Sequence, residues 1–162
     1  MAEGEFALVR QHLEQALTRT SSWVGDHDLY AMLADAAGQQ RDEPALARYT
    51  PLAEAAAARY DHPLYQAMSR RARGVLHRLR GEHAAAAAQL RQALELFSEL
   101  GARSQVGRTH GELAALAVDQ HDLDAAREHY RRALAAFEAL GAAPDAARIR
   151  EALTGLAPPA AG

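Results

Sequence analysis

The feature that most constrains this chain is a stretch of sequence that occurs twice. Residues 81–116 align without a gap on residues 121–156, so that Gly101 falls on Gly141 and the period is 40 residues. The other identical pairs are Ala85/Ala125, Ala86/Ala126, Arg91/Arg131, Ala93/Ala133, Leu94/Leu134, Phe97/Phe137, Leu100/Leu140, Ala102/Ala142, Arg108/Arg148, Leu113/Leu153 and Leu116/Leu156. A repeat of this length with helical patterning is typical of solenoids in which each helix pair buries its apolar face on its neighbours. We therefore expect an all-α, right-handed helix-pair solenoid of about eight antiparallel helices.

Apolar spacing and turn residues together predict where the helices lie. The predicted helices are 3–20, 29–40, 43–60, 64–80, 82–100, 102–119, 122–140 and 144–156. Gly81, Gly101 and Gly141 fall at turns, where a left-handed residue ends a helix. Pro51 lies inside the third helix, so it should bend that helix or make it begin late. Phe97 and Phe137 occupy equivalent positions on second helices and should both be buried.

The register divides the chain into three parts. Residues 1–24 are predicted to form an N-terminal helix and linker, equivalent to half a repeat, in which Trp23 packs between the first two helices. Residues 25–157 are the repeats with a closing helix, and residues 158–162 are a disordered tail. Leu8 stands off the apolar stripe of the first helix, and an open solenoid end usually needs a polar cap. This predicts a homodimer through the N-terminal helix.

The repeat unit resembles the tetratricopeptide repeat. The residues that carry the resemblance are Gly74, Gly81, Ala86, Leu90, Ala93 and Leu94 in one unit, and Ala114, Ala126, Tyr130, Ala133 and Leu134 in the next. The long period and the phrase ALELFSELGA look like the repeat arrays of large bacterial transcription activators and signalling ATPases. The resemblance implies a bacterial protein that binds other proteins in a concave groove. The family's clamp for C-terminal carboxylates needs Lys and Asn, and the corresponding positions here do not carry them.

Composition excludes several chemistries. The chain has no Lys and no Cys, and its formal net charge is −3. Phosphate loops of the Walker type, Schiff bases, thiolate metal sites and cysteine nucleophiles therefore have no residues to form them. The eight His residues lack a ligand spacing, and the acids near His121 and His129 suit a helix start better than a metal. We expect a cytoplasmic protein that is not an enzyme, with no cofactor, no metal, no nucleic acid and no membrane among its partners.

The stretch 70–80, RRARGVLHRLR, is the one run of charge that could form a binding site. A charge run is commonly a solvated face, and that alternative stays open. The first helices of successive pairs line the groove in the resembling repeats, which implies a groove made of Asp35, Gln39, Met68, Arg71, Val75, Arg78, Arg108 and Arg148. Arg binds carboxylates well, so the partner should be an acidic protein or peptide. A detached sensor domain for a small acidic ligand is the alternative, and nucleic-acid binding is a weaker one.

Overall fold

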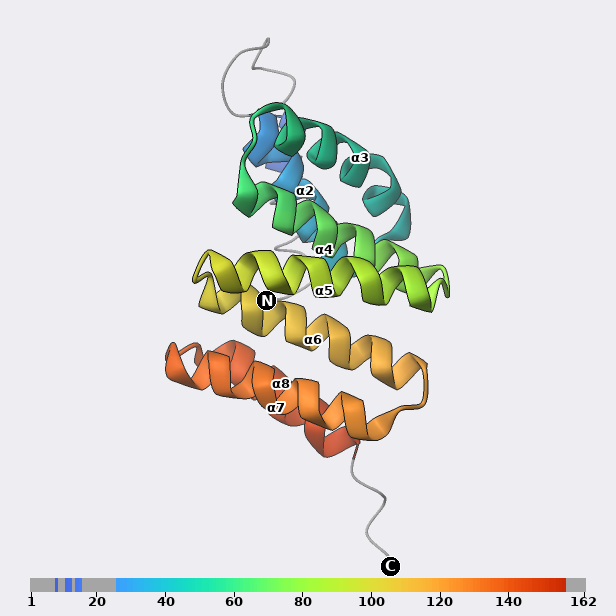
Figure 1. Ribbon diagram of the computed structural model, residues 1–162, viewed down its shortest axis with the longest axis vertical. Coiled ribbons are helices and arrows are strands. Elements are labelled where there is room, and N and C mark those ends of the chain that lie inside the picture. The colour runs from blue at the N-terminus through green and yellow to red at the C-terminus, as the bar shows by residue number, and fades with distance from the viewer. Residues whose placement is uncertain (1–7, 9–10, 13, 16–25, 157–162) are drawn as a thin grey trace, which may run out of the picture. The chain divides into compact units, whose positions relative to one another are not determined.

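The computed structural model describes residues 8, 11–12, 14–15 and 26–156. Within these residues all regular structure is helical, as the repeat predicted (Figure 1). The helices are α2 (Asp26–Gln40), α3 (Glu43–Arg59), α4 (Pro63–Leu79), α5 (His83–Glu99), α6 (Arg103–Asp119), α7 (Leu123–Ala139) and α8 (Ala143–Gly155). Each of these begins and ends within three residues of its predicted bounds. The all-α, consecutively packed fold is therefore confirmed.

The helices repeat every 20 residues, which is half of the period seen in the sequence. Helices α3 to α8 begin at residues 43, 63, 83, 103, 123 and 143. One residue with a positive φ precedes each of these starts: Arg41 (57°), Asp61 (46°), Gly81 (74°), Gly101 (64°), His121 (61°) and Gly141 (65°). The three glycines were predicted at these turns. The other three turns place side chains in a conformation that costs about 1–2 kcal/mol, so position in the repeat overrides local preference.

The chain forms two compact units, residues 1–89 and 90–162, with the boundary inside α5. In the first unit α2, α3 and α4 pack on one another. The core of this unit is Leu33, Ala34, Ala37, Ala45, Leu46, Tyr49, Ala53, Ala72, Val75 and Leu76. In the second unit α7 packs on α6 and α8, and Phe137 is buried with Ala133, Ala146 and Ile149. Phe97 and Phe137 are both 0% exposed, which confirms the prediction that they are buried equivalents.

Helix α3 runs through Pro51 without a late start. It begins at Glu43, where the side chain of Asp42 accepts a hydrogen bond of 3.0 Å from the backbone N–H of Ala45. Pro44 occupies the first turn, where its missing N–H leaves no helical bond unmade. Of the two effects predicted for Pro51, the late beginning does not occur, because the cap and the buried side chains of the first two turns hold the helix ahead of Pro51; the predicted bend stays a prediction.

Several predictions concern the ends of the chain. Residues 8, 11, 12, 14 and 15 of the predicted first helix are helical, and Leu8 is exposed. The packing of Trp23 and the tail at 158–162 lie outside the described residues, and the homodimer through the N-terminal helix stays a prediction. In the described ranges, no helix combines the length and apolar character that crossing a membrane requires.

Candidate partner-binding face on helices α2 and α4

Four residues form one stripe along α2, because they follow one another at spacings of four, three and four residues. They are Asp28, Met32, Asp35 and Gln39. Two of them bond across to α4: Asp28 to Tyr65, and Asp35 to Arg71. Met32 lies between these two contacts and is 46% exposed. We call this stripe, with the part of α4 that bonds to it, the α2–α4 face.

The strongest contact on the α2–α4 face is the ion pair of Asp35 and Arg71. Arg71 Nη2 donates to Asp35 Oδ1 over 2.8 Å, and the two side chains are only 15% and 4% exposed for Asp35 and Arg71. Gln39 Nε2 donates to the other carboxylate oxygen, Asp35 Oδ2, at 3.0 Å. Charge-assisted hydrogen bonds of this kind fix side-chain geometry firmly, and losing one partner would strand a buried charge. The pair therefore locks α2 against α4.

The second cross-helix contact joins Tyr65 and Asp28. Burial of the phenol raises the pKa of Tyr65, and the hydrogen bond that Tyr65 makes to Asp28 raises it further. The hydroxyl therefore stays protonated at neutral pH and remains a donor to the carboxylate. The two contacts hold α2 against α4, one on each side of Met32 along α2. The exposed Met32 side chain therefore lies on a rigid surface.

The Arg run at 70–80 mainly ties α4 to the two preceding helices. Besides the bond from Arg71 to α2, Arg73 Nε donates to Glu54 Oε1 at 2.6 Å, and Arg73 Nη2 also pairs with the Glu54 carboxylate. That hydrogen bonding raises the pKa of Arg73. Arg80 Nε donates to Glu43 Oε1 at 2.9 Å. Three of the five guanidiniums thus have acidic partners on α2 or α3, and of these three only Arg71 is nearly closed to solvent.

The structure brings together only part of the predicted groove. Asp35, Gln39 and Arg71 meet, whereas Met68 and Val75 are buried and Val75 belongs to the core of the first unit. These two residues cannot line an open surface, because α4 turns their side chains into the packed interface. Arg78 lies two turns beyond Arg71, in the last turn of α4, and is half-buried.

The remaining two groove residues belong to the second unit. Arg108 is half-buried on α6, and Arg148 is exposed on α8, where its guanidinium pairs with Asp145 at 3.0 Å. The acids near His121 also have local roles. Asp122 caps α7 through the N–H of Ala125 at 3.0 Å, and Asp124 and Glu128 pair with Arg residues of the same helix. In the ranges where side chains are described, no three His, Cys, Asp or Glu side chains gather as metal ligands would.

The second unit contains a His pair that sequence reasoning missed. Nδ1 of His110 on α6 lies 3.1 Å from Nδ1 of His129 on α7, so one ring donates and the other accepts. Burial lowers the pKa of His110 to about 4, and the neighbouring His129 and Arg132 lower it too, against the opposing effect of Glu128. Burial also lowers the pKa of His129, followed by the effect of Arg132. Tyr30 and Tyr49 have the same separation of 19 residues in the first hairpin, where Tyr30 packs on the core containing Tyr49. That repeated spacing was the available signal.

Comparison with known proteins supports the fold and goes no further. No family model matches the chain, and no curated protein matches it. Among solved structures, the crystal structure of BtubC (BKLC) from P. vanneervenii is similar, with a TM-score of 0.61 and 20% sequence identity. The alignment covers 99% of this chain and 79% of that chain. At this identity the likeness shows a shared helical architecture.

Proposed function

We propose that this chain is a protein–protein interaction module of the tetratricopeptide type, which binds a peptide or partner helix on the α2–α4 face. Helix pairs of this kind present side chains from successive first helices to a partner, and α2 and α4 are first helices in the 40-residue register. Binding rather than catalysis is the proposed activity, in a cytoplasmic adaptor or regulatory protein of a bacterium.

The observation that carries the proposal is the exposure of Met32 on a rigid polar frame. A large apolar side chain that is 46% exposed, between two cross-helix contacts, combines an apolar anchor with a polar rim. Interfaces between proteins have this composition, with Met enriched at their cores. The frame is already fixed by the Asp35–Arg71 pair, so ordering it on binding would cost little entropy.

The proposed partner is acidic, because Arg78 extends this face with a basic group toward the carboxyl end of α4. Arg78 occupies the last turn of α4 and continues the line of Arg71 two turns further on. A guanidinium can donate two parallel hydrogen bonds to one carboxylate, which suits a Glu or Asp on a helical peptide. Arg71 itself serves the frame through its bond to Asp35.

Direct titration with labelled peptides tests this proposal. The probes are amphipathic acidic helical peptides and their counterparts with Lys in place of Glu, measured by fluorescence polarisation against wild type, Arg78→Glu and Arg59→Glu. We expect the acidic peptides to bind, and Arg78→Glu to weaken them by about 2–5 kcal/mol if the pair is buried, and by less at a rim. Arg59 on α3 is the matched control and should have no effect.

Two results would overturn the proposal. Equal affinities of wild type and Arg78→Glu, both folded by circular dichroism, would place the binding surface elsewhere. Binding of small dicarboxylic acids that depends on Arg78, without binding of any acidic peptide, would favour a sensor for a small acidic ligand.

A further inference from the structure

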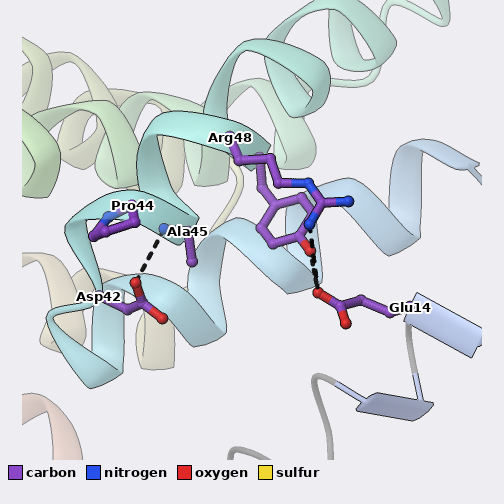
Figure 2. Close-up of a pocket in the computed structure, with 6 residues that line it drawn as sticks. Glu14, Asp42, Pro44, Ala45 and Arg48 are labelled. Atoms are coloured by element: carbon purple, nitrogen blue, oxygen red, sulfur yellow. Dashed lines mark hydrogen bonds and ion pairs between the residues drawn. The ribbon is translucent and has the colours of Figure 1, made fainter.

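A hollow of about 320 Å³ opens at the start of α3. Its lining residues are Glu14, Asp42, Pro44, Ala45, Arg48 and Tyr49. Figure 2 shows the carboxylate of Glu14, from the N-terminal part of the chain, pointing toward the guanidinium of Arg48. The hollow lies within the first unit and uses a different helix from the α2–α4 face.

Two groups contact the Glu14 carboxylate in the hollow: the hydroxyl of the buried Tyr49 and the guanidinium of the exposed Arg48. The hydroxyl of Tyr49 donates a hydrogen bond to Glu14 Oε1, and the rest of the Tyr49 side chain is packed in the core. The guanidinium of Arg48 lies over the Tyr49 ring, 5.0 Å from its centroid, and its Nη1 is 4.0 Å from the same oxygen. The fixed Tyr49 hydroxyl and the nearby Arg48 guanidinium together form a binding site for an anion, which we call the seat. Asp42 also lines the hollow, but its carboxylate is engaged by the N–H of Ala45.

Glu14 fills this seat incompletely. The Glu14 and Arg48 side chains remain 41% and 70% exposed, and open volume remains in the hollow beside them. The Arg48–Glu14 ion pair contributes little to stability at such exposure, so the hydrogen bond from Tyr49 is the main contact that a competing carboxylate must replace. The remaining volume can accommodate neighbouring groups of the helix that carries the competitor.

We propose that this hollow is a docking site for an acidic helical segment of a partner, and that Glu14 occupies it while no partner is bound. The partner presents a carboxylate where Glu14 now lies, bonded to Tyr49 and beside Arg48. The inference goes beyond the proposed function, because the hollow is separate from the α2–α4 face, and it rests on that function for the existence of an acidic partner. A partner can bind only the fraction of molecules in which Glu14 has left the seat, so its apparent affinity for the chain is reduced by that fraction. Glu14 therefore acts as an internal competitive inhibitor of partner binding.

The experiment uses the full chain and a peptide of its own sequence as the probe. A labelled synthetic peptide of residues 3–20 carries Glu14, and a matched peptide carries Glu14→Gln. Both are titrated by fluorescence polarisation against wild type and against the chain variant Glu14→Ala, which empties the seat. We expect Glu14→Ala to bind the Glu peptide about five-fold or more tightly than wild type does. The Gln peptide should bind Glu14→Ala about ten-fold more weakly than the Glu peptide.

Further variants of the chain show which residues of the hollow cause the preference for the Glu peptide. In the Glu14→Ala background, Tyr49→Phe keeps the buried ring but removes the donor, and Arg48→Gln removes the exposed cation. Each should reduce the preference for the Glu peptide to about two-fold or less. Arg59→Gln is the matched control, because Arg59 also lies over a neighbouring ring on α3, 5.7 Å from the Tyr60 centroid, and is not among the lining residues. It should leave the preference unchanged.

Three results would overturn the inference: no binding of the Glu peptide at about 1 mM, equal binding of the two peptides, or a preference that survives both Tyr49→Phe and Arg48→Gln. Since Arg48 is exposed, Arg48→Gln keeps the test decisive even if Tyr49→Phe destabilises the fold. Arg78→Glu should not alter binding of this peptide. Failure here, with acidic peptides still sensitive to Arg78, would leave the proposed function standing.

Discussion

The buried His pair makes the stability of the second unit depend on pH in a way that can be calculated. His110 is 8% exposed, and its pKa falls from 6.5 to about 4 in the folded chain. Between these two values the unfolded chain binds a proton that the folded chain does not. The contribution of His110 is therefore unchanged above about pH 6.5 and becomes progressively destabilising as pH falls toward 4.

The size of the effect follows from the same two values. One pKa unit corresponds to about 1.4 kcal/mol, so His110 alone should lower the free energy of unfolding by about 2 kcal/mol between pH 7 and pH 5. The lowered pKa of His129 acts in the same direction. Protonating both rings would also abolish the Nδ1–Nδ1 hydrogen bond, since neither nitrogen could then accept.

Urea unfolding followed by circular dichroism at pH 7, 6 and 5 measures this difference. Over that range the free energy of unfolding of wild type should fall by about 2 kcal/mol more than that of His110→Gln, because the variant has no imidazole at position 110 to protonate. His83→Gln, at the first position of α5, controls for the loss of one histidine elsewhere and should follow the wild-type curve. Parallel curves for wild type and His110→Gln would refute the reasoning.

Five substitutions test the packing and the turns of the repeat. Phe137→Ala should lower the free energy of unfolding by about 3–5 kcal/mol, whereas Leu140→Ala, an exposed residue next to the same helix end, should change it by less than about 0.5 kcal/mol; equal effects in urea unfolding would contradict the register. Gly107→Ala places a Cβ 3.2 Å from the Phe137 ring and should destabilise by about 1–3 kcal/mol, while Gly111→Ala, with its nearest neighbour at 3.7 Å, should be neutral or stabilising in the same assay. His121→Gly relieves a φ of 61° and should raise the melting temperature, with a gain of about 0.5–1 kcal/mol; a lower melting temperature would show that the His121 side chain contributes more than its backbone strain costs.

The repeat predicted the fold well because burial, not local preference, sets the helix positions. Phe97 and Phe137 mark equivalent buried positions, and the 40-residue period fixed every turn between them. The same logic explains the turns at Arg41 and His121, which contain no glycine and were missed as left-handed positions. Their place in the repeat fixes a backbone conformation that their residue types do not favour.

The candidate site was less predictable, because a linear register does not say which side of a helix is covered. It placed Asp35 and Arg71 in the same groove, but it could not show that the two would form a contact nearly closed to solvent. Val75 follows Arg71 by four residues, the spacing expected of two residues on one face of a helix, yet α4 packs Val75 into the core of the first unit. The seat for Glu14 joins residues 35 positions apart on different elements, and no repeat unit contains that pairing.

Site-specific photo-crosslinking tests the proposed binding face most directly. A photoreactive residue is placed at Met32 on the α2–α4 face, or at Leu123 on α7 in the second unit, which is exposed to a similar extent at 42%. Each chain is irradiated with the acidic helical peptide that binds most tightly. The account predicts a crosslinked product from position 32, reduced by Arg78→Glu, and little product from position 123. Equal yields from the two positions, or product from position 123 alone, would contradict it.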